Sequence, residues 1–242
     1  MARFQYDPDL SNDFTRWTDI YNSILSFKIK DGYNLKLENV QELIIKTNDT
    51  ALAYFFAYDI GYKNYKMQNV ILKAKNPKYI ILFAQNIKNA DIIALQQCIL
   101  ELNKIKDICD FACCVSGSNI KKIEKAILNH KKPDAKYIYN LIKYIDGINI
   151  NKLKTIIFKS KKPRYLFELA KHLKSKKDIC LIEDLIIKCK SKTYIKMLAE
   201  KIKGTNLEKL EQAVLDLEDA EQIKKFAGYV KKSKMKNFSI MF

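Results

Sequence analysis

The amino-acid sequence predicts an all-α fold, a right-handed α-solenoid of about seven helix-turn-helix repeats that follows an N-terminal capping helix. A polar residue followed by an apolar one recurs at intervals of 27 to 30 residues, and such a fixed period is typical of stacked repeats. The chain of 242 residues holds only six Gly and four Pro, fewer than the turns of an all-β fold require. The recurring pairs begin at Asn34, Asn64, Asp91, Asn119, Asn149, Asp178 and Asn206.

The first 33 residues depart from the repeat, and we expect them to cap the array. A helix over residues 13–30 would place one apolar stripe against the first repeat, because its apolar residues recur at helical spacing. This stripe is predicted to comprise Phe14, Trp17, Ile20, Tyr21, Ile24, Leu25 and Phe27.

Residues 149–177 illustrate one repeat. Asn149 is a favourable N-cap, because its side-chain oxygen accepts a hydrogen bond from a free N–H of the first turn. Leu153, Ile156 and Ile157 then lie on one face of a first helix. Pro163 ends that helix and favours the start of a second one, which carries its own apolar stripe. Since helices of about ten residues are marginal alone, stability has to come from stacking against neighbouring pairs.

The other repeats follow the same pattern, and each second helix carries a small residue in its apolar stripe. A short side chain allows two helices to approach closely, so we expect this position to mark the contact between consecutive helix pairs. The segment Ser175-Lys176-Lys177-Asp178 is predicted to end one second helix and to cap the next repeat. The small residues are Ala84, Ala112, Ala170, Ala199 and Ala227.

The array is predicted to span residues 34–234 within a single continuous domain, and residues 235–242 form a tail. The tail mixes Lys with apolar residues. Three interpretations stay open: a last packed helix, which we favour, a segment that docks on a partner, or a basic segment at a membrane surface.

In plan, the repeat resembles the broad class of helical-repeat proteins, including tetratricopeptide and HEAT arrays. It also resembles short repeats of about 28 residues in bacterial and phage proteins of unknown role. The period is shorter than that of a tetratricopeptide repeat, and the Trp–Leu–Gly–Tyr series of that repeat is absent. The resemblance concerns architecture alone and implies no functional residues.

Cysteine and histidine give no indication of a metal or catalytic centre. Cys98 occupies a position where other repeats carry Ala, Ile or Leu, and Cys109 and Cys113 are four residues apart on a helix, so we interpret the six Cys as small apolar core residues in a reducing environment. His130 and His172 lie in different repeats without a nearby set of acidic or Cys partners. We therefore predict no metal and no cofactor, and we leave enzymatic activity uncertain while favouring a protein without it.

The net charge of +17 is concentrated in the middle of the chain. Residues 120–203 carry 23 Lys and Arg against eight Asp and Glu. In a solenoid, the turns within successive repeats align along one edge, where Lys and Arg would bind an anionic partner and Tyr could stack on bases. The predicted anion-binding residues are Lys75, Lys78, Lys131, Lys132, Lys161, Lys162, Arg164, Lys190 and Lys192, and the predicted stacking residues are Tyr79, Tyr137, Tyr165 and Tyr194.

A simpler interpretation of the same turns also stays open. Cations at the end of a first helix complement its dipole, and a Tyr in the next turn can serve packing alone. The chain has only three Arg among its 44 basic residues, a bias that suggests a bacterial or viral AT-rich genome. Phosphate-binding surfaces favour the planar guanidinium group of Arg over Lys.

These patterns lead to one function and two alternatives. We expect a non-catalytic scaffold that engages an acidic protein partner through its basic mid-section. The first alternative is sequence-independent nucleic-acid binding through the basic turns, and the second is a helical-repeat enzyme acting on nucleic acid. Self-association is a further prediction, because the ends and the middle differ in charge. The polar, acidic start of the chain and the lack of a long apolar run predict a cytoplasmic protein without a transmembrane segment.

Overall fold

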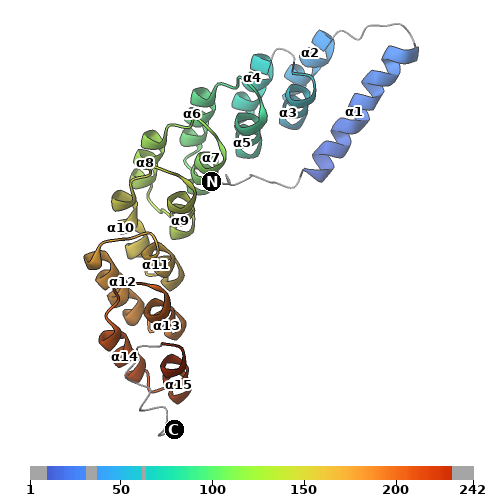
Figure 1. Ribbon diagram of the computed structural model, residues 1–242. Coiled ribbons are helices and arrows are strands. Elements are labelled where there is room, and N and C mark those ends of the chain that lie inside the picture. The colour runs from blue at the N-terminus through green and yellow to red at the C-terminus, as the bar shows by residue number, and fades with distance from the viewer. Residues whose placement is uncertain (1–9, 31–36, 62–63, 231–242) are drawn as a thin grey trace. The chain divides into compact units, whose positions relative to one another are not determined.

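A computed structural model describes residues 10–30, 37–61 and 64–230 of the chain (Figure 1). Within these residues all regular structure is helical, with fifteen α-helices and no strand, which confirms the predicted all-α class. The helices are α1 (Ser11–Lys30), α2 (Leu37–Thr47), α3 (Thr50–Asp59), α4 (Asn64–Ala74), α5 (Pro77–Asn86), α6 (Ile92–Leu102), α7 (Ile105–Cys114), α8 (Ile120–Asn129), α9 (Ala135–Tyr144), α10 (Ile150–Ser160), α11 (Pro163–Ala170), α12 (Lys176–Lys188), α13 (Lys192–Lys201), α14 (Leu207–Leu215) and α15 (Ala220–Tyr229).

The chain divides into two compact units, which we describe separately. Unit 1 comprises residues 1–131 and 144–148, and unit 2 comprises residues 132–143 and 149–242. In unit 1 the helices alternate between two rows, since α4 contacts both α2 and α6 while α5 contacts both α3 and α7 (Figure 1). In unit 2, α12 contacts α14, and α13 contacts both α11 and α15. We call the even-numbered helices α2 to α14 the first helices and the odd-numbered helices α3 to α15 the second helices.

The buried side chains follow the predicted apolar stripes. In unit 1 the first helix α6 buries Leu95 and Ile99, and the second helix α7 buries Ile108 and Phe111. In unit 2 the same positions are filled by fully buried Leu153 and Ile157 on α10 and by Leu166 and Leu169 on α11. The small residues of the second helices are buried at Ala84, Ala112, Ala170 and Ala227, and half-buried at Ala199.

Four of the repeated pairs begin at the N-cap of a described helix, and two do not, since Asn64 is the first residue of α4 and Asp178 lies inside α12. The side chains of Asp91, Asn119, Asn149 and Asn206 each accept a hydrogen bond from a backbone N–H in the first turn of the helix that follows. The predicted capping segment 175–178 does begin the next helix, with the cap at its first residue. Ser175 is the N-cap of α12, whose first helical residue is Lys176, so Asp178 lies inside the first turn and its N–H points to the Ser175 hydroxyl. A hydroxyl three residues earlier provided an equally suitable cap.

The predicted apolar stripe of the N-terminal helix lies inward at Trp17, but the prediction for Phe14 was wrong, because this residue is 54% exposed and meets the Phe55 ring only edge-on. Trp17 is buried, its ring stacks on Phe55 of α3 at 6.3 Å, and its indole N–H donates to the carboxylate of Asp59. Arg16 forms an ion pair with Asp49, the N-cap of α3, at 2.9 Å. The side chains predicted at positions 21, 24, 25 and 27, and the tail at residues 235–242, lie outside the described part of the structure.

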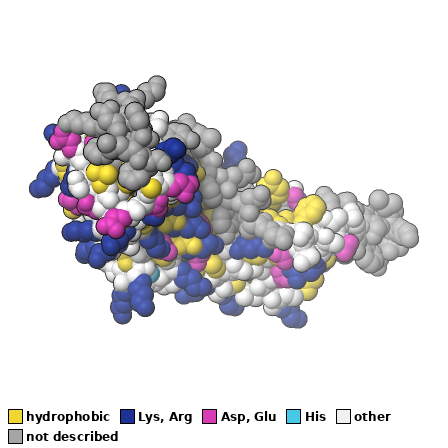
Figure 2. All heavy atoms as spheres, turned by 90° about the horizontal axis from the view of Figure 1, so that it is seen from below, with side chains coloured by type: hydrophobic (Ala, Val, Ile, Leu, Met, Phe, Trp, Pro, Cys, Tyr) yellow, Lys and Arg dark blue, Asp and Glu magenta, His cyan; other side chains and the backbone are white. Residues whose placement is uncertain are grey.

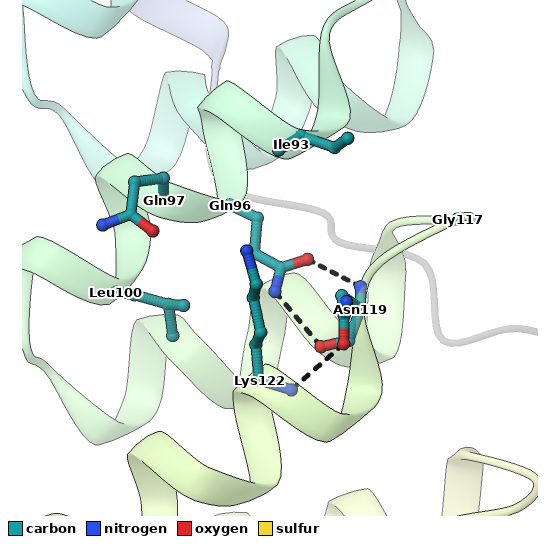
Figure 3. Close-up of a pocket in the computed structure, with 7 residues that line it drawn as sticks. All are labelled: Ile93, Gln96, Gln97, Leu100, Gly117, Asn119 and Lys122. Carbon is teal, nitrogen blue, oxygen red and sulfur yellow. Dashed lines mark hydrogen bonds between the residues drawn. The ribbon is translucent and has the colours of Figure 1, made fainter.

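Successive first helices are joined by a buried polar side chain that the sequence analysis did not identify. In unit 1 the Gln96 amide accepts a hydrogen bond from the backbone N–H of Asn119 at 2.7 Å and donates to its carbonyl at 3.1 Å (Figure 3). Gln68 likewise accepts from the N–H of Asp91 at 2.8 Å. In unit 2, Glu183 accepts from the N–H of Asn206 at 2.7 Å. Each bond fixes one first helix against the start of the next.

Candidate functional site

The turn inside a helix pair has a repeated backbone conformation. The residue immediately before the N-cap of a second helix takes a positive φ of 49 to 53° in six turns of the described chain. A left-handed residue ends a helix and lets the chain reverse. Asn adopts this conformation readily, whereas Lys and Glu adopt it at a cost of about 1 to 2 kcal/mol, which the packing of the two helices has to offset. Because the conformation repeats, the side chains at this position project from equivalent places. These residues are Asn48, Lys75, Asn103, Lys161, Lys190 and Glu218.

In unit 1, the predicted residues of the α4–α5 turn are tied to other helices. Lys75 forms a long surface ion pair with Glu101 at 3.7 Å, and Lys78 donates to Asp13 of α1 at 3.0 Å. Tyr79 is buried, and its hydroxyl also donates to Asp13. The hydrogen bond from Tyr79 lowers the pKa of Asp13, while burial and this carboxylate raise the pKa of Tyr79. The ring of Tyr79 therefore belongs to the contact with the cap helix and offers no free face to a ligand.

The α10–α11 turn of unit 2 is more open. Lys161 and Lys162 are both exposed; Lys162 has a weak ion pair with Asp134 at 3.4 Å. The guanidinium of the exposed Arg164 lies 5.9 Å from the ring centre of Tyr165. Exposed ion pairs of this kind contribute about 0 to 1 kcal/mol and leave the Lys able to exchange partners.

The α12–α13 turn repeats this arrangement one helix pair further along unit 2. Lys190 is exposed in the same left-handed conformation as Lys161, and Lys192 forms an ion pair with Asp219. Lys131 and Lys132, the remaining predicted residues, are exposed, the first at the end of the 1–131 segment of unit 1 and the second at the start of unit 2. Figure 2 shows how Lys and Arg side chains dominate the charged surface on the face drawn.

The other predicted Tyr residues are half-buried and already have neighbours. The ring of Tyr165 lies 6.2 Å from that of Tyr139, and the ring of Tyr194 lies 5.8 Å from that of Phe167. The ammonium group of Lys136 lies 5.6 Å from the ring centre of Tyr137. These distances are typical of aromatic and cation–π packing inside a protein. The rings of Tyr165 and Tyr194 therefore take part in packing between second helices, whereas the ring of Tyr137 lies beside the neighbouring Lys136. The exposed surface of the turns is mainly cationic.

His172 lies beside a polar cluster formed by Tyr139 of α9, Glu168 of α11 and Lys171, the C-cap of α11. Tyr139 donates its hydroxyl hydrogen to Glu168 at 3.0 Å, and Lys171 donates to the same carboxylate at 2.8 Å. Burial alone would raise the pKa of Glu168, but the hydrogen bonds from Lys171 and Tyr139 outweigh it, and the pKa is lowered. The exposed His172 ring meets the Tyr139 ring edge-on at 6.2 Å. The ionised carboxylate is thus already held by two donors within the protein.

Sequence reasoning missed one basic turn. Lys104 is the N-cap of α7, and Lys106 follows two residues later with an ion pair to Asp110 at 3.6 Å. They stand 28 residues after Asn76 and Lys78, so the repeat spacing would have found them.

The Cys residues lie in the packed interior or near it. Cys98, Cys109 and Cys114 are buried, and burial raises the pKa of Cys113 and of Cys114 to about 12. Thiols with such a pKa are protonated at neutral pH and react slowly. Among the described residues, no group of three or more His, Cys, Asp or Glu lies close enough together to hold a metal ion. None of the described helices combines the length and apolar character needed to cross a membrane.

Comparison with protein families, with curated proteins and with solved structures gives no match for this chain.

Proposed function

We propose that the helix pairs stack into an α-solenoid of about seven repeats that serves as a non-catalytic scaffold and binds an acidic protein partner through its basic mid-section. The observation that supports this most is the repeated, exposed cationic turn of unit 2. Lys161 and Lys190 occupy equivalent left-handed positions 29 residues apart, and Arg164 and Lys192 flank them. Side chains held on a regular backbone are suited to a partner with regularly spaced charges.

The charge of these turns is only partly neutralised within the protein. Asp134 and Asp219 each accept one Lys, whereas Lys161 and Lys190 form no ion pair with the described residues. A surface with excess positive charge raises the rate of encounter with acidic proteins, and this effect weakens as salt concentration rises.

Nucleic-acid binding through the same turns is the second candidate. It is favoured by the excess of Lys, since backbone phosphates are bound mainly through charge. Two observations favour a protein partner instead. The Tyr rings are engaged in packing, and the third turn of unit 2 carries Glu218 where the first two carry Lys. A protein partner can place a basic residue opposite Glu218, whereas a phosphate backbone cannot.

The test compares charge reversal on the two edges of unit 2. One variant carries Lys161→Glu, Arg164→Glu and Lys190→Glu. The control carries the same number of reversals at three other exposed residues, Lys174 in the loop before α12 and Lys176 and Lys177 in the first turn of α12. The two variants have equal net charge and differ only in where it changes. Binding to poly-glutamate and to a 30-mer DNA duplex is measured at several salt concentrations.

We expect the first variant to lose at least tenfold in affinity for poly-glutamate and the control to lose much less. Equal losses would show that only total charge matters and would overturn the proposed site. Tight binding to duplex DNA, with a slope of log K against log salt near −5 for about six neutralised phosphates, and no binding to poly-glutamate would favour nucleic acid.

A further inference from the structure

Three successive turns of unit 2 present a fixed order of charge. The residue before each second helix is Lys161 in the α10–α11 turn, Lys190 in the α12–α13 turn and Glu218 in the α14–α15 turn. We call these three residues the edge triad. Their φ angles are 51, 50 and 49°, and all three are exposed. The triad therefore displays positive, positive and negative charge from equivalent backbone positions.

The spacing of the triad follows from helix packing. Second helices α11, α13 and α15 contact one another in sequence, and packed helices lie about 8 to 10 Å apart. Consecutive triad charges are thus separated by about 10 Å. A partner that meets all three must carry two acidic groups and then a basic group at the same spacing.

An α-helix offers this spacing on one face. Its rise of about 1.5 Å per residue puts positions i and i+7 about 10.5 Å apart after almost two full turns. An extended strand reaches about 10 Å after three residues, but an odd number of residues points the side chains to opposite faces. In a single DNA strand the charges repeat every 3.4 Å or so and all have the same sign.

We infer that the edge triad recognises a helical segment of a partner protein that carries two acidic residues seven positions apart and a basic residue seven positions beyond them. This inference rests on the proposed function and adds the secondary structure and charge order of the partner. The two Lys would pair with the acidic residues, and Glu218 would pair with the basic one and would disfavour a uniformly acidic segment.

The experiment uses the full chain and two Ala-rich helical peptides of identical composition. In the matched peptide, Glu, Glu and Lys follow one another at intervals of seven residues. In the permuted peptide the order is Glu, Lys, Glu, so that it mismatches the triad in either chain direction. Dissociation constants are measured by NMR titration of isotope-labelled protein at low salt, where exposed charges act most strongly.

A second protein variant keeps the result independent of peptide helicity. Lys190→Glu combined with Glu218→Lys changes the order of the triad to positive, negative, positive without changing net charge. Both residue types already occupy the left-handed position in this chain, so we expect the variant to fold as the parent does. Its preference between the peptides should reverse.

We expect the parent protein to bind the matched peptide several-fold to about tenfold more tightly, a difference of up to about 1.4 kcal/mol, and the variant to prefer the permuted peptide. Equal affinity of both peptides, together with a loss of poly-glutamate binding on reversal of Lys161, Arg164 and Lys190, would overturn the charge order while leaving the proposed function intact. Binding of DNA but of no acidic peptide or poly-glutamate would overturn both.

Discussion

Lys154 of α10 and Asp178 of α12 form an ion pair at 2.7 Å, with only 19% and 14% of their side chains exposed. Lys154 stands where the equivalent first helices carry Gln68, Gln96 and Glu183. Those three side chains accept a hydrogen bond from the N–H of the next N-cap residue. At Asp178 the N–H already points to the Ser175 hydroxyl, because α12 begins earlier. An ion pair here takes the place of the backbone contact.

This relationship predicts that glutamine is a poor substitute for Lys154. Lys154→Gln removes the cation from a mostly buried carboxylate and places an acceptor where no free N–H is available. We expect the free energy of unfolding to fall by about 1 kcal/mol, since the pair is not fully buried. The control is Lys152→Gln at an exposed site of the same helix, with no expected effect. Equal urea midpoints for both variants would contradict this role of Lys154.

Gln96 provides a test of the backbone contact itself. Gln96→Met keeps the size of the side chain but leaves the N–H and the carbonyl of Asn119 without their buried partner. Unmade hydrogen bonds of buried groups cost about 1 to 3 kcal/mol, so we expect a loss of about 2 kcal/mol in urea denaturation. Gln97→Met, one residue further on an exposed face, should change stability by less than about 0.5 kcal/mol. Similar losses at both positions would exclude a special role of Gln96.

Glu183 makes stability depend on pH. Glu183 is fully buried, and its Oε2 atom has no hydrogen-bond partner among the described residues. Burial raises the pKa of Glu183, and the nearby Asp184 raises it further. The N–H of Asn206 and the charge of Lys209 act in the opposite direction, but the pKa remains raised. A raised carboxyl pKa means that the folded state favours the proton. The contribution of Glu183 is therefore complete below its unfolded pKa of about 4.3 and is lost as pH rises toward its folded pKa.

Glu183→Gln should remove this dependence. An amide can accept from the Asn206 N–H and donate to the Asn206 carbonyl, as Gln96 does with Asn119. At pH 7 to 8 we expect the free energy of unfolding of the variant to exceed that of the parent by about 1 kcal/mol, seen as a higher melting temperature. Near pH 4 the two melting temperatures should be equal. A variant that is less stable than the parent at pH 8 would show that the carboxylate is favourable when ionised.

The apolar stripes give a direct test of helix orientation. Leu153 is fully buried on α10, so Leu153→Asp places a charge in the core without a partner and should cost at least about 3 kcal/mol. Lys177→Ser changes an exposed side chain and should cost less than about 0.5 kcal/mol. The measurement is urea denaturation followed by circular dichroism, and equal tolerance of both changes would contradict the assignment of the faces.

Periodicity made the helices and their buried faces predictable, whereas the polar contacts between them were not. The stripe containing Leu153 and Ile157 follows from helical spacing alone. Gln96 follows the buried Leu95 on α6 and resembles an ordinary surface residue in the sequence. Its partner is the backbone of Asn119, 23 residues away, and a backbone group leaves no mark in the sequence. The 28-residue step from Gln68 to Gln96 was the available indication.

In the candidate site, too, the repeated positions were predictable and the contacts of their side chains were not. The repeat placed Lys161 and Lys190 in equivalent turns, and the structure gives them one backbone conformation. Sequence could not show that Tyr79 is buried against Asp13, since these residues lie 66 positions apart and meet only through the packing of α1. It also did not reveal that Asp134 and Asp219 would take up Lys162 and Lys192.

Both the stacking of the helix pairs and the proposed recognition of a partner helix require a regular distance between the residues of the edge triad. Spin labels at Lys161→Cys and Glu218→Cys, in a background whose native Cys residues are replaced, allow the distance across two helix pairs to be measured by pulsed electron resonance. Two helix spacings predict a single narrow distribution centred near about 20 Å, widened by the labels. A broad distribution, or one centred beyond about 35 Å, would contradict stacked pairs with aligned turns.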